Sequence, residues 1–463
     1  MSTNSPVRIT FHGAAQTVTG SRYLIETDKH RVLIDCGLFQ GKKELRLRNW
    51  DRPTFDPASL DAIVLTHAHI DHTGYLPLVT KLGFTGPIYC TAATNELAGL
   101  LLLDSAHLQE EEARHANKAG SSKHHPAKPL YSIRDAQAAL RQLQVIPRAA
   151  RTEILPGFGV TPVCVGHILG ATALRIDACG KLLTFSGDIG RYDAPILPDP
   201  KPVDIGDLLI CESTYGNRDH PQENTLPRLA AIINRAADRK GAILIPAFAL
   251  GRTQDLLFQL GELERAGQIP VLPVYVDSPM AIDATSIYRR YHNDFDQDDQ
   301  RLPGPGQLPL HTANTTFVHT AEESKSLNTL TGSRIIIAGS GMVNGGRILH
   351  HMLHFLGDES TTAIFVGYQA EETRGRLMLD GAPSIRIFGA NVPVRAKIEE
   401  LSGMSAHGDR NELIRWVKSC HGTPRFTKIT HGEPDASAAF CTLLKERLNI
   451  EATAAQHLET IEV

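Results

Sequence analysis

Short apolar runs rich in β-branched residues alternate with glycine-containing turns in the first part of the chain. Such runs are typical of strands. Two stretches there, 94–118 and 135–144, have helical periodicity instead. Because many short strands accompany few helices, the pattern predicts two stacked sheets flanked by helices rather than a doubly wound sheet. The predicted strands are residues 7–11, 22–27, 30–35, 61–66, 87–91, 159–165, 174–177 and 181–186.

The pattern changes near residue 217, where apolar runs and helical stretches begin to follow one another in turn. Repeated strand–helix order is typical of a parallel sheet, because a parallel connection needs a crossover. We therefore expect a second α/β domain of parallel βα, Rossmann-like type. A proline- and glycine-rich stretch at 302–306 is expected to be a surface loop within it. The predicted strands are 242–247, 271–276, 334–338 and 362–367, and the predicted helices are 252–265, 281–291 and 347–355.

Length and composition favour a soluble protein of two domains. The chain of 463 residues exceeds what one hydrophobic core usually supports. No apolar run approaches the ~18 residues that cross a bilayer, and residues 1–10 lack the apolar core of a signal peptide. Seven scattered cysteines without a Cys-x-x-Cys pair favour a reducing cytoplasm. A net charge of −4 excludes a global basic surplus, so a polyanionic partner would be attracted by a local groove or by bound metals.

Residues 67–72 read His-Ala-His-Ile-Asp-His and directly follow a predicted strand. Alternate residues of an extended segment point the same way, so His67 and His69 can bind one cation, while Asp71 and His72, past the bend, face a second. Imidazole ligands suit zinc. The alternative is a polar surface loop in which these residues fell together by chance, which 21 histidines in 463 residues make improbable.

Four residues cannot complete two coordination shells, so further ligands must come from elsewhere in the chain. His167, Asp188 and His431 each follow a predicted strand and have a glycine as a neighbour. Strand ends on one rim of a sheet converge, and glycine lets the backbone approach a metal cluster. Taken singly, each of the three is equally compatible with an ordinary loop residue.

The order of these residues resembles the metallo-β-lactamase superfamily, whose double-metal site uses a His-x-His-x-Asp-His string, a later His, a bridging Asp and a last His. The resemblance implies an αββα sandwich and two zinc ions per chain. Asp35 falls at the family's first motif, and we expect it to orient a ligand imidazole through a hydrogen bond. The resemblance assigns one zinc ion to His67, His69 and His167, the other to Asp71, His72 and His431, and the bridging position to Asp188.

Two further motifs are similar to those of the β-CASP branch of the superfamily, which processes nucleic acids. They are Glu212 in Cys-Glu-Ser-Thr-Tyr-Gly-Asn-Arg and His407 in Met-Ser-Ala-His-Gly-Asp. The resemblance implies that residues 217–384 are an inserted β-CASP domain, between two parts of the metallo-β-lactamase domain, 1–216 and 385–463. Members acting on RNA carry a histidine where His431 stands, so single-stranded RNA is the expected substrate.

The chain looks most like the bacterial and archaeal relatives of the cleavage and polyadenylation endonuclease subunit. It shares Ser-Gly-Met at 340–342, Gly-Gly-Arg at 345–347 and Gly-Tyr-Gln-Ala at 367–370. One departure is Glu371-Glu372-Thr373, where Glu-Gly-Thr is expected. If that loop contacts RNA, the added charge is expected to weaken or redirect binding.

The predicted catalytic residues are Asp71, Glu212 and His407. Two adjacent cations can lower the pKa of a water between them, so that it is a hydroxide near neutral pH, and can bind phosphate oxygens, which implies products with 3′-hydroxyl and 5′-phosphate ends. His407 is the candidate acid or phosphate clamp, and Glu212 would favour its charged form. Without the family motifs, Glu212 would be interpreted as an ordinary strand-end carboxylate and His407 as a loop histidine.

Turns between strands and helices of the second domain are candidates for phosphate binding. Those at 249–252, 277–279 and 339–342 present backbone N–H groups at helix starts. Taken alone, a glycine-rich turn is usually only a turn, but together they predict a cleft between the domains. The candidate RNA phosphate contacts are Arg252, Ser340, Gly341, Arg347, Arg374 and Arg376.

Other polar clusters are not interpreted as functional sites. His350, His351 and His354 have helical spacing and are expected to form a helix face rather than a metal site. Residues 110–112 and 124–125 are expected to be solvated, and 296–299 to form an acidic loop.

Three other functions remain open: a DNA nuclease, a small-ester hydrolase and a non-catalytic RNA-binding scaffold. A complete set of seven ligands argues against the scaffold, and the inserted domain argues against the ester hydrolase. Only His431 argues against the DNA nuclease. The sequence leaves open whether RNA is cut internally or from the 5′ end, and whether the protein forms a homodimer.

Overall fold

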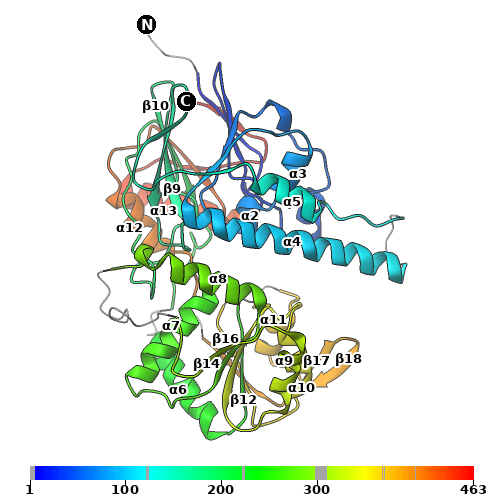
Figure 1. Ribbon diagram of the computed structural model, residues 1–463. Helices are drawn as coiled ribbons and strands as arrows, with labels where there is room; N and C mark the ends of the chain where they lie inside the picture. The colour runs from blue at the N-terminus through cyan, green and yellow to red at the C-terminus, as the bar shows by residue number, and fades with distance from the viewer. Residues whose placement is uncertain are drawn as a thin grey trace. The chain divides into compact units, whose positions relative to one another are not determined.

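The computed structural model describes residues 6–120, 125–221, 225–297, 310–367, 369, 371–401 and 403–463. The chain divides into two compact units (Figure 1). The first unit comprises Met1–Ala194, Pro198–Asp219 and His407–Val463, and the second comprises Pro195–Leu197 and His220–Ala406.

The first sheet of the first unit has the strand order β22-β1-β2-β3-β4-β5-β6. The pairs from β22 to β3 are antiparallel, and those from β3 to β6 are parallel. The strands are β1 (Arg8–Phe11), β2 (Tyr23–Glu26), β3 (Arg31–Ile34), β4 (Ala62–Val64), β5 (Ile88–Cys90), β6 (Leu143–Val145) and β22 (Thr460–Glu462).

The second sheet of this unit has the strand order β21-β20-β11-β10-β9-β8-β7. Its pairs from β7 to β10 are antiparallel, and those from β10 to β21 are parallel. The strands are β7 (Thr152–Leu155), β8 (Phe158–Cys164), β9 (Thr172–Ala178), β10 (Lys181–Phe185), β11 (Leu208–Glu212), β20 (Phe426–Thr430) and β21 (Thr453–Ala454).

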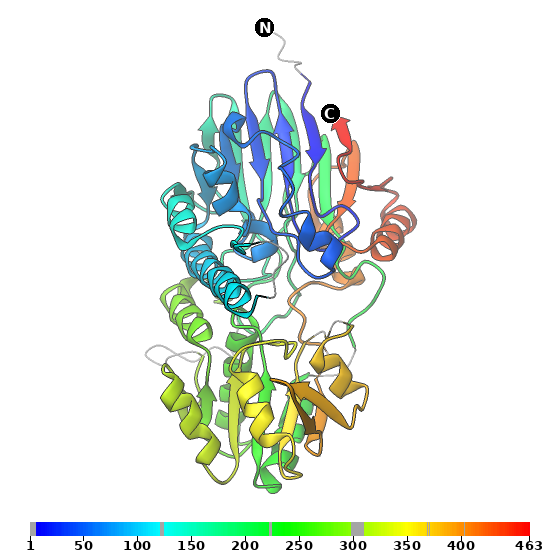
Figure 2. The same cartoon turned by 90° about the vertical axis from the view of Figure 1, so that its right-hand side faces the viewer.

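The two sheets pack face to face, with helices outside them (Figures 1 and 2). Phe11 and Tyr23 of the first sheet share one buried cluster with Phe158 and Phe185 of the second. A second cluster joins the first sheet to α3, α4 and α5, while α12 and α13 lie beside the second sheet. The predicted αββα sandwich is therefore confirmed. The helices are α1 (Lys43–Leu47), α2 (Ile70–Thr73), α3 (Leu76–Lys81), α4 (Ala92–Ala119), α5 (Ile133–Leu140), α12 (Arg410–Ser419), α13 (Pro434–Leu448) and the 3₁₀ turn η1 (Pro57–Ser59).

The second unit contains a parallel sheet of order β14-β13-β15-β12-β16-β19, with helices on both faces, and a separate hairpin, β17–β18 (Figure 1). The predicted parallel βα type is confirmed. The strands are β12 (Ala242–Pro246), β13 (Val274–Val276), β14 (Thr315–Phe317), β15 (Arg334–Ala338), β16 (Thr362–Phe365), β17 (Ser384–Ile387), β18 (Ala390–Pro393) and β19 (Lys397–Glu400). The helices are α6 (Thr225–Asp238), α7 (Arg252–Arg265), α8 (Pro279–Arg290), α9 (Ala321–Ser326), α10 (Ile348–Phe355), α11 (Arg374–Leu379), and the 3₁₀ turns η2 (His292–Asp294) and η3 (Leu327–Thr329).

The second unit is inserted between two strands that are direct neighbours. β11 pairs in parallel with β20, so Glu212 lies opposite Thr430, the residue before His431. The chain returns to the first unit at His407, later than the predicted boundary at 385. The reason is that β19 pairs with β16 of the inserted sheet.

Two local predictions differ from the structure. The helix predicted over 135–144 begins earlier, at a capping box formed by Ser132 and Asp135, and ends at Leu140. Residues 143–145 are instead strand β6, because they pair with β5. The predicted loop at 302–306 and residues 298–299 of the acidic loop lie outside the described residues.

Candidate metal centre

The His-x-His-x-Asp-His string lies where the first sheet ends. β4 ends at Val64, and the chain turns into the short helix α2, Ile70–Thr73. His69 lies at the N-cap of this helix. This turn is held from the neighbouring segment, because Cys36 N donates to His72 O and Leu38 N donates to Ile70 O. The string is therefore a fixed part of the sandwich.

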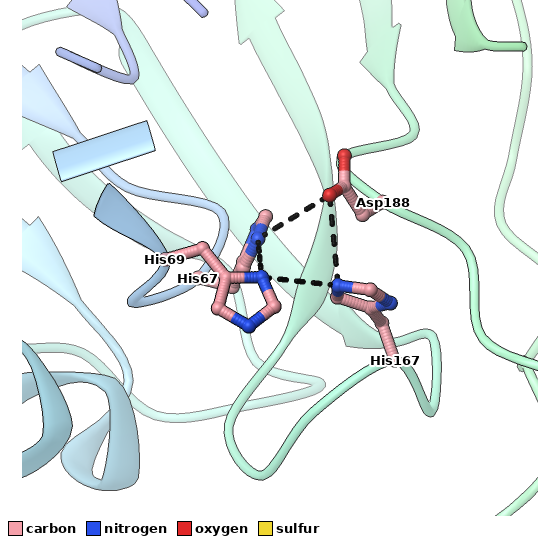
Figure 3. Close-up of side chains that lie close together, drawn as sticks. All are labelled: His67, His69, His167 and Asp188. Atoms are coloured by element: carbon pink, nitrogen blue, oxygen red, sulfur yellow. Dashed lines mark hydrogen bonds and ion pairs between the residues drawn. The ribbon is translucent and has the colours of Figure 1, made fainter. Parts of the chain in front are cut away.

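Four side chains from three segments meet in a first group (Figure 3). His69 Nδ1 lies 3.2 Å from both His67 Nε2 and His167 Nε2. Asp188 Oδ2 lies 3.5 Å from the same two Nε2 atoms. His67, His167 and Asp188 are buried. One cation could contact all four of these atoms.

A second group consists of Asp71, His72 and His431. His431 Nε2 lies 3.2 Å from His72 Nε2 and 3.4 Å from Asp71 Oδ2. The other carboxylate oxygen of Asp188, Oδ1, lies 3.3 Å from His72 Nε2. Each oxygen of Asp188 thus faces one group.

These distances fit bound cations. In a tetrahedral site with metal–nitrogen bonds of about 2.0 Å, neighbouring ligand atoms lie roughly 3.3 Å apart. Among the described residues, no group donates a hydrogen bond to the buried Asp188 Oδ1. Burial lowers the pKa of His69 to about 4 and that of His67 well below its ordinary range, so these rings favour the neutral form that binds metals. The donor set therefore suits two cations that share Asp188.

Asp35 lies behind the ligands. Its Oδ2 lies 2.8 Å from His72 Nδ1 and accepts a hydrogen bond from Thr66 Oγ1, also at 2.8 Å. The same Thr66 hydroxyl lies 3.0 Å from His67 Nδ1. The buried Asp35 carboxylate thus contacts His72 of the second group directly. It is linked to His67 of the first group through the Thr66 hydroxyl.

A second threonine takes the same position behind His431. Thr214 Oγ1 lies 3.1 Å from His431 Nδ1 and donates to His431 O at 3.2 Å. Neither Thr66 nor Thr214 is among the residues predicted from the sequence. The available signal was their position, because Thr66 directly precedes His67 and Thr214 lies two residues after Glu212.

Glu212 and His407 form a pair beside the first group. Glu212 Oε1 lies 3.2 Å from His407 Nδ1 and also accepts from Ile189 N at 2.6 Å. His407 Nε2 points toward the cluster, 3.9 Å from Asp188 Oδ2. Burial alone would lower the pKa of His407, but the charge and hydrogen bond of Glu212, followed by the charge of Asp188, raise it to about 9. This histidine is therefore a cation at neutral pH in the described site.

The candidate RNA contacts all lie in the second unit, and their arginines are engaged there. Arg347 donates to Asp277 Oδ1 at 2.6 Å and to the carbonyl oxygens of Val318 and His319. Of the histidines predicted to form a helix face, His351 is buried against the other oxygen of Asp277. The remaining pairs are Arg252 with Asp255, Arg376 with Asp380 and Arg374 with Arg386 O.

The loop carrying Ser340 and Gly341 is closed on itself. Ser340 Oγ accepts from Asn344 N and Gly345 N, and a Cβ on Gly341 would lie 3.0 Å from the ring of Phe248. Gln369 Nε2 donates to Gly341 O, which joins the predicted 340–342 and 367–370 strings. Residues 368 and 370 of the second string lie outside the described residues.

Comparison with known proteins decides the family. The model of the metallo-beta-lactamase superfamily matches residues 17–236, that of the Beta-Casp domain matches 253–378, and that of the Zn-dependent metallo-hydrolase RNA specificity domain matches 391–455. Ribonuclease TTHA0252 of Thermus thermophilus is 36% identical over 442 residues, which are 95% of this chain and 96% of that protein. The chain belongs to the β-CASP family of the metallo-β-lactamase superfamily. The predicted resemblance is thus confirmed.

Other proteins similar to this β-CASP protein extend the comparison. Transcription termination factor FttA of Methanocaldococcus jannaschii is 30% identical over 470 residues, 99% of this chain and 72% of that protein. A crystal structure of a protein of unknown function from Enterococcus faecalis shares the fold, with a TM-score of 0.55 at 13% identity and coverage of 99% and 100% of the two chains. Within the described part of this β-CASP protein, none of the helices is long and apolar enough to cross a membrane.

Proposed function

We propose that this protein is a zinc-dependent ribonuclease that hydrolyses RNA phosphodiester bonds and leaves 3′-hydroxyl and 5′-phosphate ends. The observation that carries the proposal is the pair of ligand groups sharing Asp188, with His407 Nε2 at 3.9 Å from the shared carboxylate. Two adjacent metal sites are typical of enzymes that hydrolyse phosphodiesters.

The proposed ligands divide as the two groups do. His67, His69 and His167 would hold one zinc ion, with Asp188 shared between the two. Asp71, His72 and His431 would hold the other. When bound, the two zinc ions supply Lewis acidity and a water nucleophile of lowered pKa.

His407 is proposed to protonate the oxygen that leaves the phosphate. The Glu212 carboxylate accepts from Nδ1, which directs the other proton of the cationic ring, on Nε2, toward the cluster. The charge and hydrogen bond of Glu212 raise the pKa of His407, which favours the charged ring that carries this proton. We assign Asp71 a supporting role as a ligand of the second zinc ion, because its Oδ2 lies 3.4 Å from His431 Nε2, the proposed ligand atom of that histidine.

RNA is the favoured substrate for two reasons. The relative from T. thermophilus is named a ribonuclease, and residues 391–455 match an RNA specificity domain. Among the candidate phosphate contacts, we propose Arg376 as a direct one, since its side chain is 49% exposed. Arg347 would act by holding its loop, because its guanidinium is already bonded to Asp277. Arg252, Ser340, Gly341 and Arg374 remain proposed parts of the same RNA-facing end of the second unit.

A reducing cytoplasm is the proposed location. All seven cysteines are free thiols in the structure, and cysteines of secreted proteins are commonly paired.

Cleavage of labelled single-stranded RNA and DNA of one sequence tests the function. Zinc-loaded protein is expected to cleave the RNA faster, and faster cleavage of the DNA would overturn the RNA assignment. His407→Ala should retain its zinc and lose cleavage by about a hundredfold or more. Loss of zinc from this variant would instead mean that His407 is a metal ligand. Linear and circular forms of the RNA distinguish internal cutting from 5′ exonuclease action, since only internal cutting opens the circle.

A further inference from the structure

A basic and aromatic surface segment of the first unit follows, along the chain, the residues that are hydrogen-bonded to the turn carrying the candidate ligands. Residues 40–52 include α1, and most of their side chains are exposed. The segment carries five cations against two carboxylates, a local surplus in a chain whose net charge is −4. We name Lys42, Lys43, Arg46, Arg48, Trp50 and Arg52 the basic patch.

None of the charges of the basic patch is paired with a carboxylate of the described residues, although Arg48 lies over the ring of Phe39. Within the described part of the chain, none of its five cations forms an ion pair, whereas many other exposed arginines do, such as Arg376 and Arg410. The indole of Trp50 is 59% exposed. Unpaired cations beside an exposed aromatic ring are what single-stranded nucleic acid requires, because the cations neutralise phosphates and the ring stacks on bases.

The segment is fixed rather than loosely attached. Asn49 is buried, accepts from Phe39 N at 2.9 Å and donates to Phe39 O at 2.7 Å. The guanidinium of Arg48 lies over the ring of Phe39, 5.5 Å from its centre. The patch is therefore held in place before any ligand arrives, which reduces the entropy cost of binding.

The patch is also continuous with the ligand turn. Leu38 N donates to Ile70 O of α2, and Lys42 is four residues further along the chain. Four residues reach at most about 14 Å, so the Cα of Lys42 lies within about 14 Å of that of Leu38, which is hydrogen-bonded to the turn carrying the candidate ligands. The segment before the patch is also bonded to a second loop, because Gln40 N donates to Thr19 Oγ1. Ala14 of the same loop accepts a hydrogen bond from His431 N through its carbonyl oxygen.

We propose that the basic patch binds the single-stranded RNA substrate, a few nucleotides from the bond that is cut. The inference rests on the proposed ribonuclease function and adds an RNA-binding surface in the first unit, separate from the candidates in the second. The cations would also attract an acidic protein. The exposed indole of Trp50 favours RNA over such a protein, because the indole can stack on a base.

The affinity for a fifteen-nucleotide oligouridylate, measured at several salt concentrations, tests this proposal. We use zinc-loaded protein in the His407→Ala background, so that the RNA stays intact. The triple variant Lys42→Gln, Lys43→Gln, Arg46→Gln is expected to bind roughly tenfold more weakly, and its salt dependence to fall by about two units of slope. The control variant Lys118→Gln, Arg134→Gln, Arg141→Gln removes the same charge from exposed positions and should bind as the parent does.

Tryptophan fluorescence gives a second readout. The chain has two tryptophans, and Trp416 is fully buried with its Nε1 donating to Lys201 O. RNA should therefore quench Trp50 and protect it from acrylamide, and Trp50→Ala should abolish this signal and weaken binding about tenfold.

The outcomes separate this inference from the function on which it rests. If the wild-type protein cleaves RNA while the patch and control variants bind it equally well, the patch inference is overturned and the ribonuclease proposal stands. If the wild-type protein neither binds nor cleaves RNA, the ribonuclease proposal itself fails. Binding of an acidic protein with no effect of the variants on RNA would also overturn the inference.

Discussion

Two threonine hydroxyls determine which nitrogen two of the candidate ligand imidazoles, those of His67 and His431, present to the cluster. Thr66 Oγ1 donates to Asp35, so it can only accept from the Nδ1–H of His67. Thr214 Oγ1 donates to His431 O, so it can only accept from the Nδ1–H of His431. Both rings then carry a bare Nε2, the atom that faces the cluster.

We expect Thr66→Val to weaken the cation site of His67 and Thr214→Val to weaken that of His431, each by about ten- to a hundredfold. Valine keeps the shape but cannot accept the Nδ1 proton. Thr66→Ser and Thr214→Ser keep the hydroxyl and serve as controls. Competition with a zinc indicator gives the two dissociation constants, and equal weakening of both sites by either single valine variant would contradict this role.

His12 makes the stability of the first unit sensitive to acid. Burial, followed by the charge of Arg22, lowers the pKa of His12 to about 4. Its Nδ1 lies 2.6 Å from Thr54 Oγ1. Because the folded pKa lies below the ordinary 6.5, the neutral ring favours the folded state fully above pH 6.5, and this contribution is lost as the pH falls toward 4.

Denaturant unfolding at several pH values measures this effect. His12→Asn retains a partner for Thr54 but does not titrate. We expect the wild-type protein to lose up to about 3 kcal/mol relative to His12→Asn between pH 6.5 and pH 4. Parallel pH profiles of the two proteins would contradict this, because they would mean that the pKa of His12 is the same in the folded and the unfolded state.

At the scale of elements, the turn from β4 to α2 depends on close backbone packing. A Cβ on Gly37 would lie 1.6 Å from Asp71 O and 2.1 Å from Asp71 C. No flexible side chain stands there to give way, so any larger residue must displace the ligand turn. Gly99, inside α4, has nothing within 4 Å of its added Cβ.

Gly37→Ala is expected to destabilise the first unit by about 3 kcal/mol and to lower its metal content, because the displaced turn carries four proposed ligands. Gly99→Ala should stabilise it by roughly 0.5–1 kcal/mol, since alanine is the better helix former. Urea unfolding and elemental analysis measure both changes. Normal metal content in Gly37→Ala would show that the turn tolerates the displacement.

The strand ends that carry the candidate ligands could be predicted from the sequence, because apolar runs end visibly before His67, His167 and Asp188. The elements that the pattern missed depend on distant partners. β6 is three residues long and exists only because it pairs with β5. The internal bonding of Arg347 could not be predicted either, since Asp277 lies seventy residues away. The local sequence pattern thus identified candidate metal ligands at strand ends. Which strands pair, and which arginines are already hydrogen-bonded, could be seen only in the folded structure.

At the scale of the whole molecule, the candidate metal ligands all belong to the first unit, although the chain leaves that unit between Asp219 and His407. The change of pattern near residue 217 predicted where the second unit begins, whereas the return to the first unit was predicted only through the family motifs around Glu212 and His407, and was placed at 385. The sheet tolerates the insertion because β11, before the inserted unit, and β20, after it, are neighbouring strands of one sheet.

Metal removal should therefore affect the two units unequally. By calorimetry, a chelator is expected to lower the unfolding temperature of the first unit and leave that of the second unchanged, because ligand binding stabilises only the unit that holds the ligand. Leu244→Ala, in the buried core of the second unit, identifies the second transition by lowering it. Equal shifts of both transitions on chelation would contradict this independence.

The insertion also sets an order in time. During translation the ribosome completes the first ligand group at Asp188, whereas the second must wait for His431 and the proposed proton donor for His407. A nascent polypeptide stalled within the inserted unit can therefore load at most one complete cation site. On the proposed assignment, the protein can cleave RNA only after the inserted unit and the residues that follow it have been synthesised.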